Sequence, residues 1–321
     1  MSVLLLETIH EEAEALLGAH GPYRLATDLR PAAILADAER IEAIVTRGRG
    51  RIPAQVIEGC PRLKCVARCG VGLDNIDVAA ATRRGLPVIF APGASGQSVA
   101  EHTLLLALAV AKHVARLDRL VRDGRWDDRM GYRGVELAGR TLGVIGLGDV
   151  GRRVARLATA IGMRVLYWSR RSRDAALEFR DLPDLLAEAD VVTLHLSLTP
   201  ETHGFLDATR LAQMKRGAIL INTARGALVD EAALAESLRS GHLFGVGLDV
   251  LAEEPPAPDH PLLHLPQVVI TPHTAALTES AYRRMCVETI ENMIRVLRGE
   301  PPEPRHVANR AALVAPPPEG G

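Results

Sequence analysis

Cysteine is scarce in this sequence of 321 residues. The four cysteines, Cys60, Cys65, Cys69 and Cys286, are too few and too unevenly spaced for a disulfide framework. No CxxC pair or neighbouring histidine accompanies them. We therefore expect reduced thiols and no metal site.

Long apolar runs and an excess of charge of one sign are also missing. The longest apolar run, Leu104–Ala111, is too short to cross a bilayer, and the N-terminus has acidic residues where a signal peptide would have basic ones. Lys and Arg (38) nearly balance Asp and Glu (39), which leaves a formal net charge of -1. Because no net field attracts nucleic acid or an anionic membrane, we expect a cytoplasmic protein with neither as a partner.

The rest of the composition is that of a globular protein, 47% hydrophobic and 24% charged, and the length predicts two domains. Short aliphatic runs alternate with helix-length stretches rich in Ala, Leu and Arg, a pattern typical of βαβ units and parallel sheets. The predicted strands are residues 3–6, 43–45, 66–67, 88–90, 141–145, 164–168, 191–194, 219–222, 245–249 and 268–271.

Two helices are predicted to connect the first four strands with the last six. One begins at Ser98 as N-cap, with Glu101 completing a capping box, and continues to about Asp123. The other covers about residues 278–297 and leads back to the first series. The later strands therefore look like a domain inserted into a smaller one.

A glycine-rich turn lies between a predicted strand and a predicted helix. Residues 146–151 read GLGDVG, the GxGxxG pattern. Gly146 permits a tight turn, Gly148 lets the backbone approach a pyrophosphate, and Gly151 lets the helix pack on the strand, so the helix N-terminus faces the anion. The predicted cofactor-binding residues of this turn are Gly146, Gly148, Asp149, Val150 and Gly151.

The next strand ends in Ser169, Arg170 and Arg171, at the offset where NAD enzymes place an acidic residue on the ribose 2′-OH. No carboxylate stands there. A hydroxyl and two guanidinium groups suit a 2′-phosphate, so NADP (NADPH) is favoured and NAD stays possible. The alternative is that two solvated arginines follow this strand by chance.

Three further motifs follow later strands: NTARG at residues 222–226, GLDVLAEEP at 247–255 and TPHTA at 271–275. Separately each motif can be explained without a function: Arg225 as a surface residue, Glu254 as part of an acidic loop and His273 as a core histidine. Together, in this order after the glycine turn, they resemble the D-isomer-specific 2-hydroxyacid dehydrogenases. The resemblance includes residues 70–77, 98–101 and 139–143 and extends over roughly residues 40 to 300.

Within that family the sequence looks closest to the phosphoglycerate dehydrogenase and hydroxypyruvate/glyoxylate reductase branches. The expected fold is α/β: a Rossmann-type doubly wound parallel sheet in residues 98–280, inserted into a smaller flavodoxin-like substrate domain of residues 1–97 plus 281–321. We expect the active site between the two domains and, as in the family, a homodimer formed through the long apolar helix.

The reaction implied is hydride transfer between a nicotinamide cofactor and a small 2-oxo acid or D-2-hydroxy acid. His273 can donate and accept a proton near neutral pH, Glu254 would hold its imidazole, and Arg225 would clamp the substrate carboxylate and polarise the keto oxygen. The resemblance places Asp249 at the nicotinamide and Leu196 and Ser197 at its ribose. The further predicted cofactor residues are Thr103, Thr223, Ala224 and Ala275.

On the substrate side, the resemblance implies that N–H groups of Val71 and Gly72 receive the substrate carboxylate. Arg47 and Arg68 stand at positions similar to phosphate-binding arginines of phosphoglycerate dehydrogenases. They could bind a phosphorylated or sulfonated substrate, or they could belong to a solvated basic loop, and we hold the two interpretations equal. A hydroxypyruvate/glyoxylate reductase-like enzyme is the main hypothesis and a 3-phosphoglycerate dehydrogenase-like enzyme the alternative. A dinucleotide-sensing corepressor lacks support because long disordered tails are absent, and retention of all three catalytic candidates argues against an inactive relative.

Overall fold

The computed structural model describes residues 2–314. The chain divides into two units: unit 1 is Met1–Ser95 with Leu277–Gly321, and unit 2 is Gly96–Ala276. The expected boundaries, 97/98 and 280/281, lie a few residues later in the chain. Each of the ten predicted strands occurs, with ends shifted by at most two residues.

Within the described residues, unit 2 contains a parallel seven-stranded sheet in the order β12-β11-β10-β9-β6-β7-β8. In chain order, its first six strands read 3-2-1-4-5-6, which is the Rossmann arrangement. From β6 the chain adds β7 and β8 on one side of β6, and then β9 on the other side. Such sheets bind ligands at this switch point, at the carboxyl ends of the strands. The strands are β6 (Thr141–Ile145), β7 (Arg164–Trp168), β8 (Glu178–Phe179), β9 (Val191–Leu194), β10 (Ile219–Asn222), β11 (Gly245–Leu248) and β12 (Val268–Ile270).

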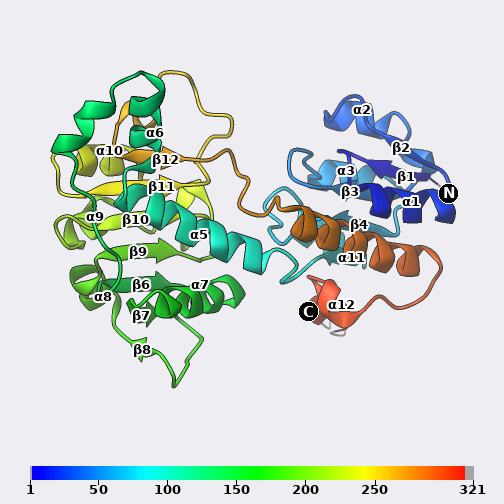
Figure 1. The fold of residues 1–321 in the computed structure, drawn as a ribbon. Coiled ribbons are helices and arrows are strands. Elements are labelled where there is room, and N and C mark those ends of the chain that lie inside the picture. Colours follow the sequence, from blue (N-terminus) through cyan, green and yellow to red (C-terminus); the bar gives the residue numbers. More distant parts are fainter. Residues whose placement is uncertain (1, 315–321) are drawn as a thin grey trace. The chain divides into compact units, whose positions relative to one another are not determined.

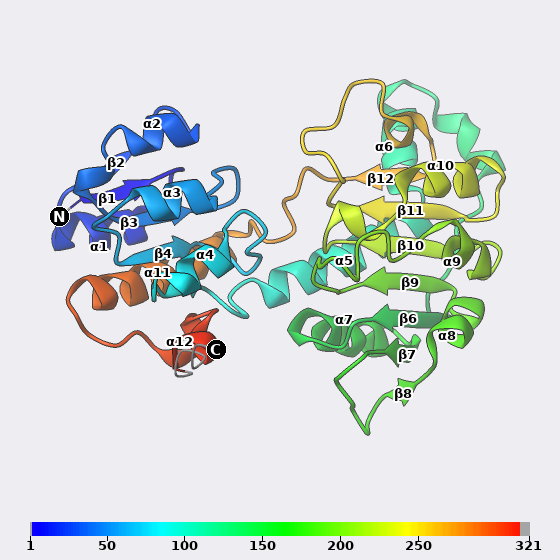
Figure 2. The same ribbon diagram turned by 180° about the vertical axis from the view of Figure 1, so that it is seen from behind.

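Helices cover both faces of this sheet because its strands are apolar on both sides. In β10, for example, Ile219 and Ile221 pack with α5 and α7, whereas Leu220 packs with α8, α9 and α10 on the other face (Figures 1 and 2). The α-helices of unit 2 are α5 (Gly96–Ala111), α6 (Val114–Arg122), α7 (Asp149–Ala160), α8 (Leu182–Glu188), α9 (Ala208–Gln213) and α10 (Glu231–Arg239). Short 3-10 helices cover Trp126–Gly131, Gly226–Leu228 and Pro261–His264.

The long helix predicted from Ser98 differs from the observed one at both ends. Helix α5 begins at Gly96, so Ser98 is not its N-cap, and the Ser98 hydroxyl instead donates to the carbonyl of Ala275 at 2.5 Å. Nor does Glu101 complete a capping box, because its carboxylate accepts a bond from the Gln97 side chain. The helix ends before His113, whose φ of 51° is left-handed, and a separate helix, α6, follows.

Unit 1 contains a five-stranded parallel sheet within the described residues, in the order β2-β1-β3-β4-β5, which is the flavodoxin-like order. Helices α1 and α11 pack on one face and α2, α3 and α4 on the other. The strands are β1 (Ser2–Leu5), β2 (Tyr23–Leu25), β3 (Ile41–Thr46), β4 (Cys65–Arg68) and β5 (Val88–Phe90). The helices are α1 (Glu11–His20), α2 (Pro31–Leu35), α3 (Ala54–Gly59), α4 (Val78–Arg83), α11 (Glu279–Leu297) and α12 (Arg310–Val314), with 3-10 turns at Ala38–Arg40 and Pro304–His306.

All four cysteines are buried free thiols in unit 1. In residues 2–314, none of the helices has the length and apolar character needed to cross a membrane. The described part of the chain also contains no group of three His, Cys, Asp or Glu residues that could hold a metal ion.

Candidate active site

The glycine turn after β6 requires glycine at two of its three glycine positions. Gly146 has φ 102°, and a Cβ there would lie 2.4 Å from the carbonyl oxygen of His195. A Cβ on Gly151 would lie 2.2 Å from the carbonyl oxygen of Gly146, so helix α7 packs directly against the turn. A Cβ on Gly148 would meet nothing within 4 Å. The open side of the turn therefore lies at Gly148, where a pyrophosphate could approach the backbone.

The loop after β9 closes over the same turn. Besides the contact of His195 with Gly146, the Leu196 side chain lies 3.0 Å from the ideal Cβ of Gly146. The carbonyl of Ser197 accepts a hydrogen bond from Thr202 at 2.7 Å, which orders the loop. His195 and Leu196 therefore border the glycine turn, although they lie far from it in the sequence, and Ser197 is the next residue of the same loop.

Ser169, Arg170 and Arg171 form the turn after β7. The hydroxyl of Ser169 accepts a bond from the N–H of Ser172 at 3.1 Å, and Arg170 and Arg171 are exposed. The Thr199 hydroxyl, a backbone N–H and the positive charge of Arg170 lower the pKa of Glu201. Glu201, which was not predicted, is therefore close enough to Arg170 for their charges to interact.

The carboxylate of Asp249 organises the loop that carries His273. Its Oδ1 accepts bonds from the Thr271 hydroxyl (2.5 Å) and the Thr274 N–H (2.9 Å), and its Oδ2 accepts one from the Ala275 N–H (2.9 Å). The backbone carbonyl of Asp249 also accepts the N–H of His273 at 2.8 Å. Because the Asp249 residue is only 1% exposed, these bonds form in the interior, where they are strong.

Helix α5 contributes two residues beside this loop. Nε2 of His102 lies 2.8 Å from the Thr271 hydroxyl and 3.5 Å from Oδ1 of Asp249. The hydroxyl of Thr103 lies 2.9 Å from that of Thr223. The structure thus places Thr103 against Thr223 and Ala275 against Asp249. His102, which was not predicted, lies beside Thr271 and Asp249.

The three catalytic candidates lie on adjoining loops of unit 2. Nδ1 of His273 lies 2.7 Å from Oε2 of Glu254, and the other oxygen of Glu254 accepts the N–H of Leu251 at 3.1 Å. Burial raises the pKa of Glu254, but the hydrogen bond and charge of His273, the Leu251 N–H and the charge of Arg225 outweigh it and lower the pKa. Glu254 is therefore a carboxylate at neutral pH, and it accepts the Nδ1–H of His273.

The turn that carries Arg225 is shaped by Asn222, whose side-chain amide donates to the Arg225 carbonyl (2.8 Å) and whose oxygen accepts the Ala224 N–H (3.0 Å). The Arg225 guanidinium donates to the Ala224 carbonyl at 2.6 Å. Next to it, a Cβ on Gly226 would lie 1.9 Å from the carbonyl carbon of Leu251. The Arg225 turn and the loop leading to Glu254 are therefore in direct backbone contact.

Glu231, on α10, anchors the loop that carries Glu254. Its Oε1 accepts the N–H of Ala252 at 2.8 Å, and its Oε2 lies 3.1 Å from Nε2 of His260. Nδ1 of His260 accepts the N–H of Leu262, so Nε2 carries the proton and donates to Glu231. This anchor has no motif of its own and was not predicted.

Unit 1 holds the residues expected to bind substrate. Val71 is 44% exposed, and the N–H groups of Val71 and Gly72 have no acceptor within residues 2–314. Arg68 donates to the carbonyls of Gly72 (2.9 Å) and Cys69 (3.3 Å), so it supports the loop that presents these N–H groups. Arg47 donates to the hydroxyl of Tyr282 at 3.1 Å.

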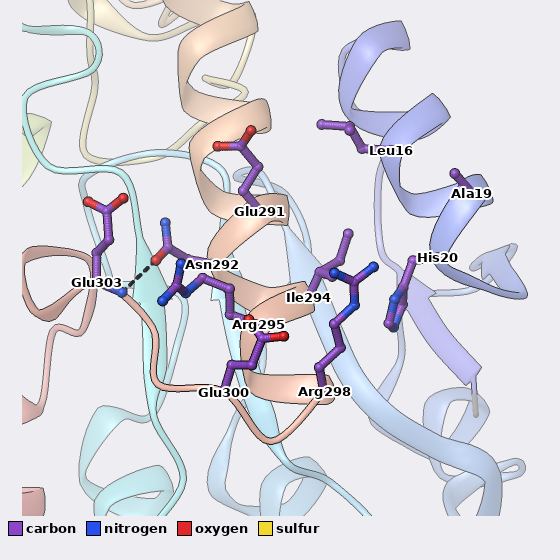
Figure 3. A pocket seen from close by; sticks show the side chains of 10 residues that line it. All are labelled: Leu16, Ala19, His20, Glu291, Asn292, Ile294, Arg295, Arg298, Glu300 and Glu303. Atoms are coloured by element: carbon purple, nitrogen blue, oxygen red, sulfur yellow. Dashed lines mark hydrogen bonds between the residues drawn. The ribbon is translucent and has the colours of Figure 1, made fainter.

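Unit 1 also contains a cavity of about 510 Å³. Figure 3 shows it between α1 and α11, with Arg298 and His20 on facing sides. The charged residues lining it have mixed signs, with Glu291 and Glu300 beside Arg298. None of the predicted site residues lines this cavity.

Known proteins match this chain along most of its length. Residues 104–275 match the family model "D-isomer specific 2-hydroxyacid dehydrogenase, NAD binding domain". A D-3-phosphoglycerate dehydrogenase of Archaeoglobus fulgidus is 40% identical over 307 residues, which are 94% of this chain and 58% of that protein. A glyoxylate reductase of Korarchaeum cryptofilum is 39% identical over 326 residues, 98% of each chain.

Among solved structures, the NADPH-dependent glyoxylate/hydroxypyruvate reductase of Sinorhizobium meliloti, in complex with NADP and malonate, is similar with a TM-score of 0.85. It is 28% identical, and the match covers 92% of this chain and 93% of that one. The chain thus spans about three fifths of the length of the phosphoglycerate dehydrogenase and nearly all of the glyoxylate reductase. On its ordered motifs, its fold and these matches, the chain belongs to the D-isomer specific 2-hydroxyacid dehydrogenase family.

Proposed function

We propose that this protein reduces a small 2-oxo acid, in the manner of a hydroxypyruvate/glyoxylate reductase, to the corresponding D-2-hydroxy acid. The observation that carries the proposal is the 2.7 Å contact between Nδ1 of His273 and Oε2 of Glu254, with the charge of Arg225 acting on the same carboxylate. A proton donor oriented by a carboxylate and a neighbouring guanidinium are what a carbonyl reduction needs from a protein.

Each side chain has a separate task in this scheme. Glu254 accepts the Nδ1–H of His273 and so leaves Nε2 to give its proton to the developing alkoxide. Arg225 pairs with the substrate carboxylate in a planar fork and polarises the keto oxygen. A nicotinamide cofactor, when bound, supplies the hydride. Oxidation of the D-2-hydroxy acid uses the same groups in reverse.

NADPH is the proposed cofactor, with NAD as the second possibility. The open side of the glycine turn at Gly148 fits a pyrophosphate. Arg170 and Arg171 are exposed after β7, and residues 169–171 themselves include no carboxylate that would repel a 2′-phosphate. The NADPH-dependent relative from Sinorhizobium meliloti supports this choice by likeness alone.

A 3-phosphoglycerate dehydrogenase-like activity is the second candidate. Its support comes from two arginines of unit 1: Arg68, which bonds the Gly72 carbonyl, and Arg47, which bonds the Tyr282 hydroxyl. The likeness to the phosphoglycerate dehydrogenase of Archaeoglobus fulgidus points the same way, although that protein is considerably longer.

The deciding experiment measures steady-state reduction of glyoxylate, hydroxypyruvate, 3-phosphohydroxypyruvate, pyruvate and 2-ketogluconate, each with NADH and with NADPH. We expect the highest kcat/KM for glyoxylate or hydroxypyruvate with NADPH. His273→Ala should lower kcat by about 100- to 10,000-fold while NADPH binding is retained. His203→Ala, which changes an exposed histidine of the same unit, is the control. If the protein reduces none of these acids with either cofactor, the proposal is refuted.

We further propose a homodimer formed through α5 and the segment after it. Leu105, Val114, Val121, Trp126 and Met130 are between 51% and 75% exposed, which is unusual for large apolar side chains so close in sequence. A second copy of the chain would cover them, as in other symmetric oligomers. Sedimentation equilibrium at micromolar concentration tests this, and a strict monomer would contradict it.

A further inference from the structure

The carboxylate of Glu7 fills a concave cluster of backbone N–H groups in unit 1. Glu7 follows β1, next to the loop of residues 46–50 that ends β3, at the carboxyl edge of the sheet. Its Oε1 accepts bonds from the N–H groups of residues 47, 48, 49 and 50, at 2.8 to 3.2 Å, and lies 3.1 Å from the Thr46 hydroxyl. Consecutive N–H groups that converge in this way form a nest that binds anions. Here a side chain of the same protein takes that place.

A negative charge is therefore held close to Arg47. The Glu7 side chain is only 8% exposed, and its Oε2 lies 3.9 Å from Nε of Arg47. Burial raises the pKa of Glu7. Hydrogen bonds from the N–H groups of Gly50, Gly48 and Arg47 and from the hydroxyl of Thr46 have the larger, opposite effect, so the pKa is lowered overall. The group is ionised at neutral pH and offsets part of the positive charge of Arg47.

The same hydrogen bonds connect Glu7 to the segment expected to bind the substrate carboxylate. The Asn75 amide donates to the Thr46 hydroxyl (3.0 Å) and to the Gly50 carbonyl (2.7 Å). Asn75 belongs to the segment 70–77, which also presents the free N–H groups of Val71 and Gly72. On the other side, the Arg47 guanidinium lies 5.2 Å from the ring centroid of Tyr282 and bonds its hydroxyl. Arg47 is thus fixed from two sides.

We propose that Glu7 is a positioning and specificity-determining residue, which fixes the loop carrying Arg47 and lowers the affinity of the site for substrates with a second anionic group. The proposal rests on the proposed reduction of 2-oxo acids. A phosphate ester carries nearly two negative charges, so it gains from any increase in the local positive potential. The hydroxyl group of hydroxypyruvate, at the corresponding position, is neutral and gains nothing.

Glu7→Gln separates charge from shape. The amide oxygen of glutamine can still accept the N–H groups of the nest, whereas the negative charge beside Arg47 is lost. Glu7→Asp is the complementary variant, because it keeps the charge but is too short by one methylene to fill the nest. Glu11→Gln, which removes an exposed carboxylate at the start of α1, is the matched control.

The measurement is kcat and KM for hydroxypyruvate and for 3-phosphohydroxypyruvate with saturating NADPH. For Glu7→Gln, we expect the ratio of kcat/KM for the phosphorylated over the unphosphorylated acid to rise about 5- to 30-fold, through KM. Its kcat for hydroxypyruvate should stay within about twofold of the unmodified protein, since the proton donor is untouched. High salt should reduce the rise, because the effect is electrostatic. Glu7→Asp should raise KM for both acids without raising the ratio, and Glu11→Gln should change neither.

An equal change for both substrates in Glu7→Gln, or an unchanged ratio, would overturn the proposal and leave Glu7 as a structural anchor. If Glu7→Gln does not fold, Glu7→Ala, which also removes the charge, tests the same ratio in a buffer free of phosphate, because a phosphate bound in the nest would restore a negative charge. An unmodified protein that reduces no 2-oxo acid would instead refute the proposed function. The two failures are therefore distinct.

Discussion

Nδ1 of His273 lies 2.7 Å from Oε2 of Glu254, although the residues are 19 positions apart in the chain. Three contacts keep the two loops together: Asp249 holds the His273 loop, Glu231 holds the Glu254 loop, and the backbone of Gly226 touches the latter at Leu251. His273 itself has a left-handed φ of 55°, a conformation that costs free energy in a residue with a side chain. The hydrogen bonds of the Asp249 carboxylate and carbonyl to this loop hold the backbone of His273 in that conformation.

Glu254→Gln should lower kcat for 2-oxo acid reduction by about 10- to 1000-fold, because a neutral amide holds the Nδ1–H tautomer of His273 less firmly. Its pH range for reduction should also be narrower. A pH series of kcat and kcat/KM checks both effects, with Glu253→Gln, next to it in the chain, as the control. A variant with unchanged rates at every pH would show that Glu254 has no part in the reaction.

Gly226→Ala should damage both stability and rate. The added Cβ would lie 1.9 Å from the carbonyl carbon of Leu251, so the Arg225 turn must move away from the Glu254 loop. We expect a loss of about 1 to 3 kcal/mol in the free energy of unfolding, and a larger loss in kcat than in NADPH affinity. Thermal unfolding, NADPH titration and turnover measure these quantities. Gly131→Ala, where a Cβ meets nothing within 4 Å, should leave all three unchanged, and equal behaviour of the two variants would contradict the prediction.

Cofactor choice should depend on the turn after β7. One or two charge-assisted bonds to a 2′-phosphate imply a preference of roughly 10- to 1000-fold in kcat/KM for NADPH. The double variant Ser169→Asp with Arg170→Ala should reverse it. Glu201→Gln should strengthen it, because a negative charge that interacts with Arg170 is then gone. Arg216→Ala, an exposed arginine elsewhere in unit 2, is the control. Equal use of NADH and NADPH by the unmodified protein would rule this out.

Protonation of Glu7 at acidic pH should lower the stability of unit 1. The pKa of Glu7 lies below the ordinary 4.5 in the folded protein, so its contribution to stability is complete above that pH and is lost as pH falls through the lowered value. Melting temperatures measured from neutral pH down to about pH 3 should therefore fall less steeply for Glu7→Gln than for the unmodified protein in this acidic window. Glu11→Gln should follow the unmodified curve. Parallel curves for all three proteins would mean that Glu7 does not couple protonation to folding.

Local sequence patterns were enough to predict the alternation of strands and helices, the position of the glycine turn and the order of Arg225, Glu254 and His273. These features depend on local periodicity and on residues adjacent in the chain, which is why the ten strands were found within two residues of their ends. The edge strands β2 and β8 were missed because a short edge strand needs few apolar side chains. The start of α5 was misplaced because the Ser98 hydroxyl bonds a carbonyl 177 positions away.

The polar groups that support the predicted site could be identified only from the folded structure. Glu7 accepts N–H groups that lie about 40 residues later in the chain. His102 contacts Thr271 across 169 positions, and Glu231 accepts the N–H of Ala252 across 21 positions. None of these residues belongs to a motif, because a buried carboxylate or imidazole is specified by the donors and acceptors that the folded backbone brings to it. The residues that carry the proposed chemistry can therefore be read from the chain, whereas those that hold them in place become visible only when distant strand ends meet.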